Sequence, residues 1–163
     1  MGEDPYLDPT TGLLRNLLGI NDAGELARAE AAYTGRRIRE LERQPIPGRF
    51  GLAHLQAIHR YITQDLVDWA GALRTLDISK GGTSFCPVQN LHAFAGQIFD
   101  ELARSHHLRD LTREDFVTGL ATFYGDLNAL HPFREFNGRT QRTLMSQLAH
   151  QAGWHIATAL PSP

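Results

Sequence analysis

Cysteine, net charge and long apolar runs are all scarce in this sequence of 163 residues. The single cysteine, Cys86, excludes an intrachain disulfide and a zinc site built from several thiolates. No apolar run approaches membrane-spanning length, and the first residues, Met1 to Pro5, lack a basic stretch followed by an apolar one. The formal net charge of −2 argues against binding to nucleic acid or anionic membranes through bulk charge. We therefore expect a cytoplasmic protein without a membrane partner or a direct nucleic-acid partner.

The pattern of apolar residues predicts an all-α fold. No repeat, low-complexity tract or linker divides the chain, so we predict a single domain over residues 1–163. Residues 1–12 contain several prolines and glycines and form an irregular lead-in. Asp22, followed by Glu25 three positions later, predicts the start of a helix that runs towards Arg43.

Four further segments, within 52–62, 91–102, 116–130 and 144–152, show helical spacing of apolar residues. Residues 73–86 differ, because they partly alternate and contain the turn sequence Ser-Lys-Gly-Gly-Thr, which predicts a short β-hairpin. The expected architecture is a helical bundle with one projecting hairpin.

Histidine pairs do not support a metal hydrolase. His54 and His59, and likewise His150 and His155, are five residues apart, which is the wrong spacing for two ligands on one helix face. The sequence also lacks a His-Glu-x-x-His motif.

The segment 131–142, between two predicted helices, concentrates residues that are suited to chemistry. His131 follows the apolar face of a helix, and its ordinary pKa of about 6.5 suits it to accept a proton from a hydroxyl group. Glu135 is a suitable ligand for Mg²⁺, which usually binds one or two carboxylates together with phosphate oxygens.

The second half of this segment is suited to binding anions. Asn137 and Gly138 lead into a helix, whose N-terminal N–H groups and dipole favour a phosphate. Arg139 and Arg142 share one face of its first turn, where two guanidiniums can bind separate phosphates. Each residue alone is more often structural, but the combination predicts a polyphosphate site.

Residues 131–142 read His-Pro-Phe-Arg-Glu-Phe-Asn-Gly-Arg-Thr-Gln-Arg and resemble the signature of Fic-domain proteins. That signature is His-x-Phe-x-Asp/Glu-Gly-Asn-Gly-Arg-x-x-Arg. Residues 68–82 look like the family's flap, and residues 6–16 look like the start of its short, toxin-like branch. The similarity spans residues 6 to about 155 and implies a Fic-type helical bundle with a β-hairpin flap over 73–86.

The resemblance implies a protein adenylyltransferase, which moves AMP from ATP to a hydroxyl side chain of a target protein. His131 would be the catalytic base, and Glu135 would bind Mg²⁺ between the α- and β-phosphates. Asn137 would contact the α-phosphate, while Arg139 and Arg142 would bind the β- and γ-phosphates.

The resemblance also assigns residues outside this set. Gly138 and Phe136 would belong to the nucleotide-binding residues, and Phe133 would be a core residue. The flap would bind an extended segment of the target along its edge. The flap residues expected to do so are Leu76, Asp77, Ile78, Ser79, Lys80, Gly81 and Gly82.

Phe136 occupies a position where the family has glycine or, in some branches, alanine. A glycine there lets the backbone approach phosphate oxygens closely. Three arrangements are open: the ring points away from the phosphates, crowds them, or closes the site. We expect an impaired or altered enzyme.

Regulation of the family suggests a partner. Family members are typically restrained by a helix that carries Ser/Thr-x-x-x-Glu-Gly/Asn, whose glutamate pairs with the second motif arginine. No serine or threonine of this chain has a glutamate four residues later. The resemblance therefore implies a small antitoxin that carries this helix and neutralises Arg142, and B subunits of type II topoisomerases as targets. Two alternatives stay open: a non-catalytic nucleotide- or antitoxin-binding protein, and a phosphotransferase that binds the nucleotide in reverse.

Overall fold

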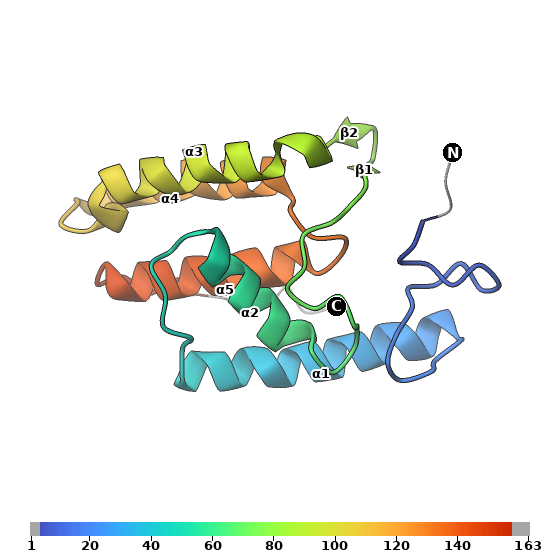
Figure 1. Cartoon of the computed structure of the whole chain (residues 1–163). Helices are drawn as coiled ribbons and strands as arrows, with labels where there is room; N and C mark the ends of the chain where they lie inside the picture. The colour runs from blue at the N-terminus through green and yellow to red at the C-terminus, as the bar shows by residue number, and fades with distance from the viewer. Residues whose placement is uncertain (1–3, 158–163) are drawn as a thin grey trace.

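The computed structural model describes residues 4–157 and confirms the mostly helical fold in that range (Figure 1). Its elements are α1 (Ala23–Arg43), α2 (Leu52–Thr63), β1 (Ser79–Lys80), β2 (Thr83–Ser84), the 3-10 turn η1 (Val88–Asn90), α3 (Leu91–Arg104), the 3-10 turn η2 (His106–Leu108), α4 (Arg113–Leu130) and α5 (Asn137–Gln151). The predicted lead-in over 1–12 lies within the described residues only from residue 4 onward.

Side chains at the helix ends fix where the helices begin. The carboxylate of Asp22 accepts a hydrogen bond from the backbone N–H of Glu25 at 2.8 Å, which confirms the predicted start of α1. Thr112 accepts from the N–H of Asp115 at 3.1 Å in the same way at the start of α4. Each cap satisfies a backbone N–H that has no partner inside the helix.

α2 lies in the middle of the bundle, where it packs against α1, α3 and α5, and α4 packs against α3 and α5. Figure 1 shows α3 and α4 running along one side of the molecule and α1 along the other. The side chains at the centre are aliphatic and are inaccessible to solvent: Leu55, Ile58, Ile62, Leu127, Leu130, Leu144 and Leu148. Burial of each such side chain contributes about 1.5–3 kcal/mol. The helices on both sides of the 131–136 loop are therefore anchored in the core.

The hairpin is shorter than predicted. Only Ser79–Lys80 and Thr83–Ser84 form strands, joined by Gly81 and Gly82. Both glycines have positive φ, 56° and 80°, as a tight hairpin turn requires. The two ends of the 73–86 segment are not strands, because backbone N–H groups there donate to residues outside the segment. The N–H of Arg74 donates to Pro132 O, and that of Cys86 donates to Ala129 O, both at 2.9 Å.

The N-terminal segment contacts both the base of the hairpin and the 131–136 loop. The hydroxyl of Tyr6 accepts a hydrogen bond from the N–H of Thr75 at 3.1 Å, and its ring packs edge-on against Trp69 with centroids 5.2 Å apart. Asp4 forms an ion pair with Arg134 at 2.8 Å. These contacts connect three segments that are far apart in the sequence.

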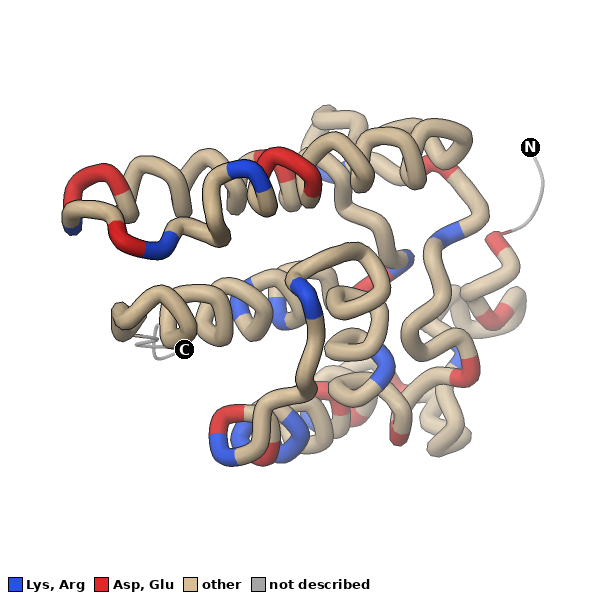
Figure 2. Tube along the Cα trace, turned by 60° about the vertical axis from the view of Figure 1, so that its left-hand side comes forward, with Lys and Arg blue, Asp and Glu red and all other residues tan. Residues whose placement is uncertain are grey.

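Charges of both signs interleave along α1, as Figure 2 shows. Arg37 forms a small network of ion pairs, with Glu40 on the same helix at 2.9 Å and with Asp65, just after α2, at 2.7 Å. Among the helices of the described residues, none combines the length and the apolar character that a membrane crossing needs.

Candidate active site

A cavity of about 590 Å³ lies where α1, the hairpin, the end of α4 and the start of α5 meet. All seven residues predicted to be catalytic, metal-binding or nucleotide-binding line it. Its lining consists of Glu30, Lys80, Thr83, Phe85, Asn128, His131, Glu135, Phe136, Asn137, Gly138, Arg139 and Arg142. The fold thus brings the predicted site residues together, and it adds groups from α1, α4 and the hairpin.

His131 caps the C-terminal end of α4 in the left-handed conformation, with φ of 43°. Its Nδ1 lies 3.2 Å from the carbonyl oxygen of Asn128. Because a carbonyl can only accept, we assign the proton to Nδ1, which leaves a free lone pair on Nε2. Burial lowers the pKa of His131; the bond to Asn128 opposes this effect, and the charges of Arg74 and Lys80 add to it. The imidazole is therefore neutral near pH 7 and able to accept a proton.

The loop between His131 and α5 is braced from inside. The amide of Asn137 accepts from the N–H of Phe133 at 3.0 Å and donates to its carbonyl at 2.8 Å. These two buried hydrogen bonds leave one side-chain N–H of Asn137 without a partner in the loop. Its contact with the α-phosphate stays a prediction. Phe133 is buried, as expected of a core residue, and stacks on His59 with ring centroids 3.8 Å apart.

His59 connects the loop to α2. Its Nε2 donates to the carbonyl of Glu135 at 3.1 Å, and its Nδ1 accepts from the N–H of Gly71 at 2.9 Å. Burial lowers the pKa of His59 to about 4, so the ring is neutral, as this pair of bonds requires. His59 is therefore structural, and the backbone of the loop depends on it.

Phe136 also adopts the left-handed conformation, with φ of 64° and ψ of 15°. A residue other than glycine is strained there by about 1–2 kcal/mol. The side chain is only 5% exposed and packs in a second apolar cluster with Leu66 and Val67, with Trp69 at its edge. The guanidinium of Arg139 lies 5.5 Å from the centre of the ring. The ring thus packs into this cluster and also borders Arg139 in the cavity lining, so all three arrangements stay predictions.

The two motif arginines are available for an anion. Arg139 is half-buried and Arg142 is exposed. Neither has an acidic side chain within 4.0 Å among residues 4–157. A β-carbon added at Gly138 would lie 3.0 Å from a guanidinium nitrogen of Arg142, so any larger residue would displace that arginine. Glu135 has a half-exposed side chain with only a loose pairing, 3.6 Å, to Arg134.

Sequence reasoning missed Glu30, which α1 brings to the same cavity. Burial raises the pKa of Glu30; the charge of Arg139 opposes this shift and that of Glu135 adds to it. A glutamate within a long amphipathic helix carries no sequence signal for such a role. Only the packing of α1 against α2 reveals it.

Among the seven predicted flap residues, all of which the structure describes, Lys80 alone lines the cavity. The others lie on the surrounding surface, where Leu76 and Ile78 are half-buried and the rest are exposed. This placement leaves the hairpin accessible beside the cavity.

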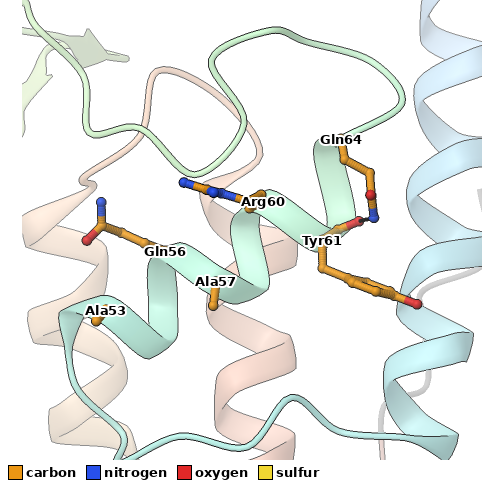
Figure 3. Close-up of a pocket in the computed structure, with 6 residues that line it drawn as sticks. All are labelled: Ala53, Gln56, Ala57, Arg60, Tyr61 and Gln64. Carbon is orange, nitrogen blue, oxygen red and sulfur yellow. Dashed lines mark hydrogen bonds between the residues drawn. The ribbon is translucent and has the colours of Figure 1, made fainter.

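A second hollow, of about 380 Å³, lies along the outer face of α2 (Figure 3). Figure 3 shows Ala53 and Ala57 at its floor, with Gln56, Arg60, Tyr61 and Gln64 around them. It contains no carboxylate and no histidine, so it lacks the acid–base groups of the first cavity.

Residues 49–149 match the model of the Fic/DOC family. The chain belongs to the Fic/DOC family. This confirms the family inferred from residues 131–142.

Two curated Fic relatives align over almost the whole chain. Protein adenylyltransferase VbhT of Bartonella schoenbuchensis is 46% identical over 94% of this chain, which spans 32% of the relative. "Probable protein adenylyltransferase Fic" of Salmonella typhimurium is 41% identical over 96% of this chain and 77% of its own length. The chain thus spans about a third of the length of the first relative and most of the second.

Solved Fic structures share the fold. The N-terminal Fic domain of a VirB-translocated Bep effector protein from Bartonella quintana, solved with bound ADP, has a TM-score of 0.90 and 27% identity. That match covers 96% of this chain and 80% of the other. BepC of Bartonella tribocorum gives a TM-score of 0.91 at 24% identity over 96% and 82% of the two chains. The all-α fold with a hairpin is therefore that of Fic domains.

Proposed function

We propose that this chain is a protein adenylyltransferase that moves AMP from ATP to a hydroxyl side chain of a target protein. The relatives from B. schoenbuchensis and S. typhimurium are named for this activity and align over 94% and 96% of the chain. One observation carries the proposal. A neutral imidazole, His131, lines the same cavity as two guanidiniums, Arg139 and Arg142, that form no ion pair among residues 4–157. A base beside a polyphosphate clamp suits transfer from ATP to a hydroxyl group.

In the proposed reaction, Nε2 of His131 takes the proton of the target hydroxyl while that oxygen attacks the α-phosphorus of ATP. The new oxygen–phosphorus bond forms as the bond from the α-phosphorus to the bridging oxygen breaks. Pyrophosphate leaves with the electron pair. Arg139 and Arg142 bind the β- and γ-phosphates and stabilise the charge of this leaving group, and the N-terminal end of α5 adds its dipole.

The donor set fits a magnesium ion that is bound mainly through the nucleotide. Residues 4–157 contain no cluster of three or more acidic, histidine or cysteine side chains, and Glu135 offers one accessible carboxylate. Mg²⁺ is commonly held in this way, by one or two carboxylates together with phosphate oxygens. When bound, the ion neutralises charge on the phosphates. Glu135 is the residue that would hold it.

The hairpin would dock the target. Its strands are two residues long and exposed, and within residues 4–157 each pairs only with the other strand, which leaves one edge of each open to a partner. An extended peptide that adds a strand to such an edge gains main-chain hydrogen bonds. It would then run beside His131, because Lys80, Thr83 and Phe85 line the same cavity.

We further propose toxin-like regulation in the cytoplasm. Arg142 is exposed, and it is the residue that the glutamate of a small antitoxin, carrying a Ser/Thr-x-x-x-Glu-Gly/Asn helix, would neutralise. The B subunits of type II topoisomerases are the proposed targets. Expression without the antitoxin should slow growth, and Arg142→Ala should bind the antitoxin more weakly. Normal growth and an absence of any small co-purifying protein would count against this regulation.

The test of the activity compares two labels. The chain is incubated with cell lysate, or with a purified topoisomerase B subunit, and with ATP labelled at either the α- or the γ-phosphate. Transfer of the α-label alone, lost in His131→Ala but kept in His92→Ala, supports adenylyl transfer; His92 is exposed on α3, outside the cavity. Transfer of the γ-label would show a phosphotransferase. Absence of both labels would show a non-catalytic protein.

A further inference from the structure

Arg74 is a buried cation that connects the hairpin to the end of α4. Its side chain has no accessible surface. Nε donates to the carbonyl of His131 and Nη1 to that of Leu76, both at 2.9 Å, and Nη2 donates to the carbonyls of Cys86 and Leu130. Leu76 and Cys86 lie on the two legs of the hairpin, while Leu130 and His131 end α4. One guanidinium thus donates to four carbonyls, which belong to three backbone segments.

The end of α4 makes burial of this charge tolerable. A buried guanidinium is stable only when its N–H groups are paired, and the last carbonyls of a helix carry partial negative charge. The carbonyls of Leu130 and His131 are of this kind. Burial lowers the pKa of Arg74, and nearby Cys86, Asp77 and Tyr6 oppose the shift. Since arginine titrates far above neutral pH, the side chain stays charged.

These bonds fix both the main chain and the ring of His131. The carbonyl of His131 is bound directly, and the neighbouring Pro132 carbonyl accepts from the backbone N–H of Arg74 at 2.9 Å. Phe85, the residue before Cys86, stacks on the imidazole with ring centroids 3.8 Å apart and planes 15° apart. Movement of Cys86 would therefore also move the ring of Phe85, which stacks on the imidazole of His131.

The phosphate clamp is anchored by other groups. Arg139 and Arg142 lie on the first two turns of α5, whose start is fixed by the bonds between Asn137 and the backbone of Phe133. None of the four acceptors of Arg74 belongs to α5. Binding of ATP and placement of the base thus depend on separate supports.

We infer that Arg74 is a positioning residue for the transfer step: it holds His131 and the target-docking hairpin in register, while ATP binding does not depend on it. This inference rests on the proposed adenylyl transfer. It predicts that loss of Arg74 lowers the rate of transfer from bound ATP and leaves the affinity for ATP intact.

The experiment uses the full chain and the variants Arg74→Met, Arg74→Lys and Arg37→Met. Arg37 is the control, because it is a half-buried arginine that also pairs with other groups, Asp65 and Glu40, but lies outside the cavity. Calorimetry gives the dissociation constant for ATP, and α-labelled ATP at saturation gives kcat. Arg74→Met should lower kcat at least tenfold with the dissociation constant within twofold of the original. Arg74→Lys should recover part of kcat, since it keeps the charge but bonds fewer carbonyls. Arg37→Met should keep both values.

A second measurement does not need activity. Amide hydrogen exchange reports whether the N–H of Cys86, bonded to Ala129 O, becomes less protected in Arg74→Met. Unchanged kcat or unchanged exchange at Cys86 would overturn the inference. Loss of ATP binding in both Arg74 variants would also overturn it, because Arg74 would then support the whole fold. If the original chain transfers no AMP, the proposed function fails, and the exchange measurement still decides the role of Arg74.

Discussion

Replacement of Phe136 by glycine removes a ring and relieves a strained backbone at the same position. The ring is 5% exposed and packs against Leu66 and Val67. Loss of a phenylalanine from such a site destabilises by about 3–5 kcal/mol. Relief of the left-handed strain returns about 1–2 kcal/mol. We therefore expect Phe136→Gly to lower the free energy of unfolding by about 2–3 kcal/mol, which for a domain of this size lowers Tm by roughly 4–12 °C.

The same substitution should change catalysis little. The ring packs with the residues that follow α2, so its removal should leave kcat for AMP transfer within about threefold, too small a change to reflect loss of a transition-state contact. Arg139 lies 5.5 Å from the ring centre, a cation–π contact that contributes about 0.5–1 kcal/mol. Its loss should raise KM for ATP by about two- to fivefold, as that energy implies.

Urea denaturation and transfer of α-labelled AMP would be measured on the same preparations. Phe136→Asn is the control, because asparagine tolerates the left-handed conformation without restoring either the ring or the backbone freedom of glycine. The two variants should behave alike in kcat. A glycine variant that is at least tenfold faster than both the original chain and Phe136→Asn would refute this reasoning. It would show that the family's glycine acts through close approach to the phosphates, and that Phe136 impairs the enzyme.

Three further outcomes are expected. His59 has its pKa lowered to about 4 by burial, whereas in the unfolded chain it titrates near its ordinary value of about 6.5. As the pH falls, the unfolded state therefore binds the proton first. The free energy of unfolding is at its full value above about pH 6.5 and falls by about 3 kcal/mol towards pH 4. Urea denaturation across this range should show that the free energy of unfolding depends more steeply on pH in the original chain than in His59→Gln. Glu30→Gln should tighten ATP binding about two- to tenfold in calorimetry by removing a negative charge near Arg139, with exposed Glu25→Gln as an inert control. Asp4→Asn should lower the free energy of unfolding by about 1 kcal/mol, because it breaks a partly exposed ion pair with Arg134. The double variant Asp4→Asn, Arg134→Met should be no less stable than Arg134→Met alone.

Local chemistry explains why the helices were predictable from the sequence. Asp22 forms the capping bond that its position implied, and the apolar spacing of α4 matches the side that packs in the core. The hairpin was only partly predictable. The turn depends on two glycines and is recognisable in the sequence. The residues before β1 do not form the predicted strand, because Arg74 hydrogen-bonds to the carbonyls of His131 and Pro132, in a loop about sixty residues away.

The chemistry of the site was predictable where it is local in sequence. His131 and Arg139 are eight residues apart and fall in one loop and helix start, so their motif is readable without a fold. Glu30 and His59 reach the site from other helices. A glutamate on an amphipathic helix and a histidine on an apolar face resemble ordinary surface and core residues, so only packing distinguishes them.

The departure from the family motif at Phe136 becomes understandable through the groups that fix its backbone. A left-handed residue persists when its surroundings over-determine it. Here the carbonyl of the preceding residue is bound by His59, and the carbonyl of Phe136 itself accepts from the N–H and hydroxyl of Thr140 at 3.1 and 2.9 Å. The two hydrogen bonds between Asn137 and the backbone of Phe133 set the direction in which α5 begins. With the main chain fixed on both sides, the side chain at this position is free to differ as long as its ring can be buried. Because these buried bonds position the residues that are predicted to face phosphates, we expect replacement of the glycine by Phe136 to leave the predicted anion site in place.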